Sequence, residues 1–191
     1  MSTEHHVAGQ GAPLVRLGEA NGASPAHDIL ARQFRVIALE TPDLGRPPEA
    51  ASAVGRAIEG LGLAEFNLMA SADASAAALW LALAQPERVR ALVLESPTAI
   101  GSEPRDAELE RRLPEVTTPT LILFGTADRQ AAQDTGRVYT RLIPNSHLVF
   151  VYDAAAAIGR DRPEAFAEVV ADFLERHEAF IISRTPTVIH P

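Results

Sequence analysis

The sequence predicts a single α/β domain, with a doubly wound, mostly parallel sheet of about six strands and helices on both faces. Short apolar runs alternate with longer segments of helical spacing along most of the 191 residues. Several runs, among them RVIALE, TLILFG and HLVFVY, are apolar almost without interruption. Such runs are typical of strands that are covered on both faces, as in a parallel sheet.

The individual elements follow from these patterns. Strands are predicted at Leu14–Leu17, Arg35–Leu39, Phe66–Met69, Ala91–Leu94, Thr120–Phe124 and His147–Tyr152. Helices are predicted at Glu49–Leu61, Ala74–Ala84, Thr135–Leu142 and Pro163–His177, and a further helix opens at Ala26-His27-Asp28. Pro163 suits the first turn of its helix, because the N–H that proline lacks would have no partner there.

The chain divides into a domain and two short ends. We expect residues 1–12 to be an N-terminal stub, 13–177 the domain, and 178–191 a C-terminal tail. The tail contains the apolar run Ala179–Ser183, and an unpaired apolar strand invites association. We therefore expect the tail to join a sheet edge, either in its own chain or in the partner of a homodimer.

The composition excludes several partners and chemistries. The formal net charge of −8 disfavours nucleic acid and anionic membranes, because both bind basic surfaces. The chain has no cysteine, which excludes disulfides and thiolate chemistry. No basic and apolar leader and no membrane-spanning apolar run is visible, so we expect a soluble, cytoplasmic protein. No complete metal-ligand set is visible, and no cofactor is expected.

Residues 66–94 carry the most specific pattern. The run FNLM leads into ASADA at residues 70–74, followed by a helix rich in alanine and leucine and then by PERVRALVL. This resembles the nucleophile elbow of the α/β-hydrolase fold superfamily, the esterases and lipases among them, where a G-x-S-x-G turn joins a strand to a helix. The resemblance places Ala70 and Ala74 at the two glycines and Ala72 at the serine.

Other segments resemble the same superfamily in the same order, over roughly residues 12–176. PTLILFGTAD resembles the strand that delivers the catalytic acid and places Asp128 there. RPEAF resembles the start of the C-terminal helix, and alignment backwards from it puts the family's histidine on Ala156. Only about twenty-five residues separate the predicted strands that end at Leu94 and begin at Thr120, so no cap domain is expected. The first two strands of the family fold are nearly absent before Pro13.

The resemblance implies a degenerate catalytic triad. The mechanism needs a serine, a histidine that takes the serine's proton, and a carboxylate that orients the histidine. Only the carboxylate position, Asp128, is filled, because alanine stands at positions 72 and 156. Loss of the serine or histidine costs subtilisin about 10⁶-fold in kcat. We therefore expect a protein that lacks serine-hydrolase activity and acts by small-molecule binding or assembly.

Polar residues around the expected cleft are the candidate binding residues: Gly18, Glu19, Ser71, Asp73, Asp128 and His27. The first two follow the strand where the family has its oxyanion loop, and Ser71 and Asp73 flank Ala72. His27 lies in the loop that crosses the cleft mouth, although an exposed histidine at a helix start is the simpler interpretation. Asp128 either contacts a ligand or serves as a helix cap or ion-pair partner.

Other residues offer alternative nucleophiles. Ser71 and Ser75 are shifted candidates, but no histidine is placed to activate either. A one-residue shift would make Asp73 a dehalogenase-like nucleophile; a favourable partner for the helix dipole is the simpler role. Trp80 is interpreted as core packing rather than a ligand platform.

The alternative function is a weak or unconventional esterase-type hydrolase that uses Asp73, Asp128 and His27. A deliberately altered sequence is a third explanation. The altered glycine positions at Ala70 and Ala74 argue against it.

Overall fold

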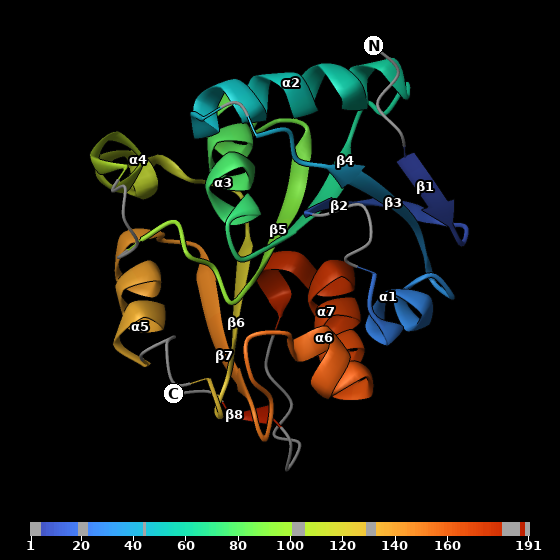
Figure 1. Ribbon diagram of the computed structural model, residues 1–191, viewed down its shortest axis with the longest axis vertical. Coiled ribbons are helices and arrows are strands. Elements are labelled where there is room, and N and C mark those ends of the chain that lie inside the picture. Colours follow the sequence, from blue (N-terminus) through green and yellow to red (C-terminus); the bar gives the residue numbers. More distant parts are fainter. Residues whose placement is uncertain are drawn as a thin grey trace.

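The computed structural model describes residues 5–18, 23–43, 45–100, 106–128, 133–180 and 188–189. Within these ranges one sheet of eight strands has the order β1-β3-β2-β4-β5-β6-β7-β8 (Figure 1). The strands are β1 His5–Ala8, β2 Ala12–Gly18, β3 Phe34–Glu40, β4 Phe66–Ser71, β5 Val89–Glu95, β6 Thr120–Gly125, β7 Ser146–Val151 and β8 Val188–Ile189. All six predicted strands are present as β2 to β7, and they pair in parallel throughout.

Helices cover both faces of the sheet. They are α1 Pro25–Leu30, α2 Pro47–Gly60, α3 Ala74–Ala84, α4 Ala107–Arg112, α5 Gln133–Leu142, α6 Ile158–Asp161 and α7 Pro163–Arg176. Short 3₁₀ turns follow at η1 Leu113–Glu115 and η2 His177–Ala179. Buried residues of α2 to α5 pack in one cluster against the sheet, and those of α1, α6 and α7 pack in a second cluster on the opposite face (Figure 1).

The apolar runs of the sequence follow from this two-sided burial. Along β2, Val15 and Leu17 face the α2–α5 cluster, whereas Leu14 faces the α1–α6–α7 cluster. Alternate side chains of a strand point to opposite faces, so a strand covered on both faces is apolar at successive positions. The fold therefore explains why these strands do not show an apolar–polar alternation.

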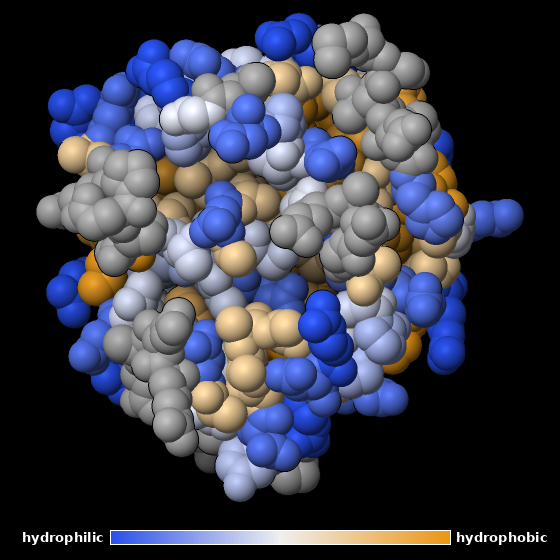
Figure 2. All heavy atoms as spheres, in the orientation of Figure 1, coloured by the Kyte–Doolittle hydropathy of each residue, from blue (hydrophilic) through white to orange (hydrophobic). Residues whose placement is uncertain are grey.

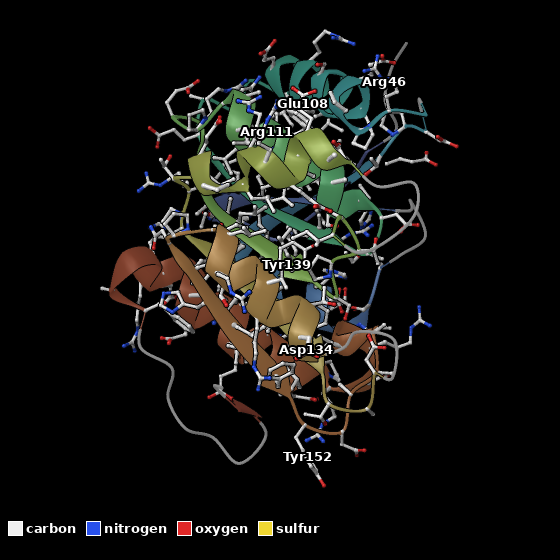
Figure 3. All side chains as sticks on the ribbon, turned by 90° about the vertical axis from the view of Figure 1, so that its left-hand side faces the viewer. Arg46, Glu108, Arg111, Asp134, Tyr139 and Tyr152 are labelled. Carbon is white, nitrogen blue, oxygen red and sulfur yellow. The ribbon has the colours of Figure 1, made fainter. Side chains whose placement is uncertain are left out.

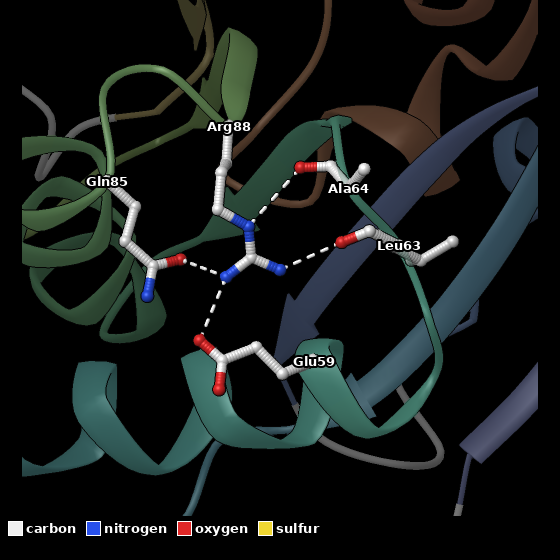
Figure 4. Close-up of polar contacts among 5 residues, drawn as sticks. All are labelled: Glu59, Leu63, Ala64, Gln85 and Arg88. Atoms are coloured by element: carbon white, nitrogen blue, oxygen red, sulfur yellow. Dashed lines mark hydrogen bonds and ion pairs between the residues drawn. The ribbon is translucent and has the colours of Figure 1, made fainter.

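Arg88, in the PERVRALVL run, fixes the corner between the α2–α3 layer and the sheet (Figure 4). Its guanidinium donates to the carbonyl oxygens of Leu63 and Ala64, at 2.8 and 3.3 Å. It also donates to Gln85 Oε1 at 2.8 Å and to Glu59 Oε1 at 3.1 Å. This run therefore serves structure in the present chain.

The N-terminal stretch differs from the prediction of a mere stub. Residues His5–Ala8 form β1, which pairs antiparallel with β3 in a register that places His5 opposite Leu39. The segment HHVA contains no apolar run, so strand periodicity gave no signal there. Its pairing with β3 defines it as an edge strand instead.

The C-terminal tail does join the sheet edge of its own chain, but through a different segment. Val188–Ile189 forms β8, antiparallel to β7, with Ile189 opposite Phe150. In the predicted run Ala179–Ser183, Ala179 ends η2 and Phe180 is buried, 5.2 Å from the His147 ring and 5.4 Å from the Phe173 ring between centroids. The rest of that run lies outside the described residues.

Between β5 and β6 the described chain contains only α4 and η1, so no cap domain is evident there. Asp106 caps α4 and accepts a hydrogen bond from Trp80 Nε1 at 2.8 Å, which holds α4 against α3. Trp80 is 7% exposed and packs in the core, as expected. No helix in the described ranges has the length and apolar character needed to cross a membrane.

Candidate functional site

The turn between β4 and α3 has the backbone of a strained elbow. Ala72, which the sequence resemblance places at the family's serine position, has a φ of +44°. Its N–H donates to the Glu95 carbonyl at 3.0 Å, and its own carbonyl accepts from the Ser75 N–H at 3.0 Å. A left-handed conformation is costly for a residue other than glycine, and such strain concentrates at functional turns. Ala72 is exposed at this turn.

The elbow residue is Ala72 and not Asp73. The backbone of Asp73 is ordinary right-handed helix, with a φ of −66°. The pairing of β4 with β5 does shift register between Phe66 and Asn67, but the positive φ remains at Ala72. The backbone therefore does not favour the one-residue shift that would make Asp73 the nucleophile.

Polar groups next to the elbow hold the segment that follows β5. Asp73 Oδ1 accepts from Thr98 Oγ1 at 2.8 Å. Ser75 is fully buried, and its Oγ accepts from the N–H groups of Thr98 and Ala99, both at 3.2 Å. The Tyr139 hydroxyl accepts from the Ile100 N–H at 3.0 Å, and burial raises the pKa of this phenol (Figure 3). Asp73 and Ser75 thus have structural partners, and Tyr139 is a member that sequence reasoning missed.

The turns after β6 and β7 carry the other two positions of the resemblance. Asp128 is half-buried, and Ala156 is exposed between β7 and α6. The two turns touch through backbone, since the Ala127 N–H donates to the Ala154 carbonyl at 2.9 Å. A Cβ on Gly125 would lie 2.0 Å from that same carbonyl oxygen, so only glycine fits there. Tyr152, in the turn after β7, points away from the molecule and is 56% exposed (Figure 3).

A pair of buried charged residues lies beside the elbow and was not predicted from the sequence. Arg16 is 4% exposed near the end of β2, and Glu95 is 9% exposed at the end of β5. Glu95 Oε1 accepts from the Gly159 N–H at 2.8 Å, at the start of α6. Burial raises the pKa of Glu95 against the opposing effects of the α6 amides and Arg16, and burial lowers the pKa of Arg16. The sign of this pair in the sequence is one charged residue near the end of each of two otherwise apolar strands.

His27 is half-buried, not exposed as the simpler interpretation expected. Its Nδ1 accepts from the Ser24 N–H at 2.8 Å and lies 3.1 Å from Ser24 Oγ. Burial, followed by the charge of Arg16, lowers the pKa of His27 to about 4, although Asp28 and a backbone hydrogen bond act in the opposite direction. His27 is therefore a neutral helix-capping residue at neutral pH.

The structure brings some of the candidate residues together. Gly18 has a φ of +151°. If it carried a Cβ atom, that atom would lie 3.4 Å from Arg16 Nη1 and 3.7 Å from Ser71 Oγ. Gly18, Ser71 and Arg16 therefore meet at the carboxyl edge of the sheet, and Arg16 links them electrostatically to His27. Glu19 lies outside the described residues. Among the residues that are described, no group of three histidines and carboxylates could hold a metal ion.

The surface in this orientation is mainly hydrophilic, with small separate areas of hydrophobic character among the coloured residues (Figure 2). Two open pockets lie away from the elbow. One, of about 620 Å³, is at the amino edge of the sheet around Thr118 and His177, and the other, of about 360 Å³, is between α1 and α7.

No protein-family model matches the chain. No curated protein matches it in sequence. Solved structures do match in three dimensions. A CIB-like hydrolase from Thermoplasma acidophilum has a TM-score of 0.72 at 17% identity, covering 85% of this chain and 86% of that one.

Two further structures match over more of the chain. An α/β-hydrolase enzyme from a metagenome of Mar Chica lagoon sediments, Morocco, has a TM-score of 0.79 at 20% identity, covering 90% of this chain and 94% of that one. An enol-lactonase from Burkholderia xenovorans has a TM-score of 0.76 at 18% identity, covering 90% and 96%. At these identities the likeness concerns fold alone. The chain has the α/β-hydrolase fold.

Proposed function

We propose that this α/β-hydrolase-fold protein lacks serine-hydrolase activity and acts by binding a small molecule or through assembly. The observation that supports the proposal most directly is Ala72 at the strained elbow. A methyl group there offers no oxygen to attack an acyl carbon, and Ala156 offers no ring to carry the proton. The attack on the acyl carbon and the transfer of the proton each lack the side chain that would perform them.

The neighbouring polar residues are poorly suited to replace them. Ser75 is fully buried and its oxygen faces two backbone N–H groups, so an ester has no route to it. Ser71 is half-buried beside Arg16, which carries no acceptor for a proton. The low pKa of His27 makes it a weak base at neutral pH, because a general base works best with a pKa near the operating pH.

A ligand would contact the exposed carboxyl edge around the elbow. Gly18 and Ser71 meet there, and Asp73 and Asp128 stand on the turns that follow β4 and β6. The shallow site between them suits polar contacts more than burial of a large apolar group, because no cap covers it in the described chain. Assembly as a homodimer remains part of the same proposal.

The test is intact-mass analysis after incubation with a fluorophosphonate, alongside turnover of a short-chain activated ester. We expect no adduct and no turnover above buffer. A stoichiometric adduct with steady turnover would overturn the proposal. Ser71→Ala and Ser75→Ala variants would then identify which serine reacted, while a thermal-shift screen of small molecules tests the binding half of the proposal.

A further inference from the structure

Helix α1 begins with a capping box in which histidine takes the position usually held by glutamate or glutamine. The Ser24 N–H donates to His27 Nδ1 at 2.8 Å, and the His27 backbone N–H donates to the Ser24 carbonyl at 2.9 Å. Protonation of imidazole turns both ring nitrogens into donors. The reciprocal bond to His27 therefore exists only while this residue is neutral.

The surroundings of α1 oppose a second positive charge. Burial disfavours a proton on His27 most strongly, and the charge of Arg16 on β2 acts in the same direction; Asp28 on α1 favours the proton. The charged groups on the elements around α1 include Arg16 on β2, Glu95 on β5, Asp161 on α6, and Glu164 and Glu168 on α7. Glu95 accepts a hydrogen bond from the start of α6, and Glu164 and Glu168 of α7 line the pocket between α7 and α1.

Helix α1 is short, and its buried residues belong to the core cluster that it shares with α6 and α7. The helix has six residues, with Ala26 and Leu30 as its buried members. An open pocket of about 360 Å³ lies beside the contact between α1 and α7, lined by Ile29 and Leu30 on one side and Ala167 and Ala171 on the other. At its start, Ser24 rests on Gly159 so closely that a Cβ on this glycine would be 2.8 Å from Ser24 Oγ. The capping box and this contact thus hold the beginning of α1 against α6.

We propose that α1 is an acid-released latch over the carboxyl edge of the sheet. Protonation of His27 breaks the capping box beside a buried arginine, and α1 separates from α6 and α7 while the sheet stays folded. Release uncovers Arg16 and the start of α6 next to the elbow.

The size of the effect follows from the two states of His27. Its pKa is about 4 with α1 in place and returns towards the ordinary 6.5 once α1 is released. Acid therefore favours release below 6.5, and the opening equilibrium rises about 30-fold between pH 7.5 and pH 5. Glu95 has a raised pKa, so its own protonation favours the folded state at low pH and does not produce this release.

The experiment is hydrogen exchange followed by mass spectrometry at pH 7.5 and pH 5, with each rate corrected for the intrinsic pH dependence of amide exchange. In the wild-type chain, protection of the α1 amides should fall about 30-fold while that of β6 stays unchanged. Equal protection of α1 at the two pH values would overturn the proposal. So would equal loss in α1 and β6, because this would mean global unfolding.

His27→Gln is the informative variant, because glutamine keeps a capping-box acceptor that does not titrate. Its α1 amides should keep their protection at pH 5. His147→Gln, a second half-buried histidine on β7, is the matched control and should show the wild-type loss. If His27→Gln loses protection as the wild type does, His27 is not the switch. If this variant does not fold, the comparison of the wild-type chain at pH 7.5 and pH 5 still tests the proposal.

Discussion

Two residues at the carboxyl edge show how much local strain the fold holds. Ala72 and Ser96 have φ angles of +44° and +42°. Each follows the end of a central strand, and a left-handed backbone costs a non-glycine residue about 1–2 kcal/mol. The backbone of Ala72 keeps this strained conformation although its methyl side chain has no reactive group. The strain therefore belongs to the way β4 turns into α3.

Replacement of Ala72 by glycine should relieve that strain. We expect Ala72→Gly to raise the free energy of unfolding by up to about 1 kcal/mol, because glycine adopts positive φ freely and this gain exceeds its extra unfolded-state entropy. Ala76→Gly, inside α3, is the matched control and should lower it by about 1 kcal/mol. Urea denaturation measures both, and a loss of stability in Ala72→Gly would contradict the strain argument.

At the scale of elements, one side chain adds hydrogen bonds to the apolar packing that joins the α2–α3 layer to the sheet. Arg88 connects Glu59 at the end of α2, Gln85 after α3 and the carbonyl oxygens that precede β4 (Figure 4). Its side chain is 17% exposed, and its guanidinium lies 5.7 Å from the centre of the Phe66 ring. Hydrogen bonds from a shielded charged group to carbonyls are stronger than those at an open surface. This junction therefore contributes to stability in a way that surface ion pairs do not.

Arg88 and Arg90 provide a direct comparison within one strand region. Arg88→Ala should lower the free energy of unfolding by about 1–2 kcal/mol, since the part-buried Leu63 carbonyl and the packing on Phe66 lose their partner. Arg90→Ala removes only the ion pair with Glu65, whose side chains are 55% and 56% exposed, and should change stability by less than about 0.5 kcal/mol. Chemical denaturation of both variants checks the difference. Equal losses would show that the Arg88 contacts add nothing beyond a surface pair.

At the scale of the molecule, the elements that the sequence predicted are those that show a pattern over consecutive residues. The apolar runs gave β2 to β7, and the elbow pattern placed Ala72 at a turn whose φ is +44°. Strand β1 was missed because its four residues have no apolar run, and only pairing with β3 defines it. The electrostatic interaction of Arg16 with Glu95 and the hydrogen bond from Gly159 to Glu95 were missed for a similar reason. They join residues far apart in the chain, and each residue alone resembles an ordinary strand end or loop.

These buried charges connect β2, β5 and α6, so their energetic coupling is a property of the whole assembly. Removal of one charge leaves the other in a poorly solvated site, which typically costs about 3 kcal/mol or more. We therefore expect Arg16→Met and Glu95→Gln each to destabilise the protein by about 3 kcal/mol, and the double variant to cost less than the sum of the two. Chemical denaturation at pH 7.5 measures all three, and the difference from additivity gives the coupling. Additive losses would mean that Arg16 and Glu95 act independently, each through its own neighbours, and that the sheet and α6 are held together by the Gly159 hydrogen bond and apolar packing alone.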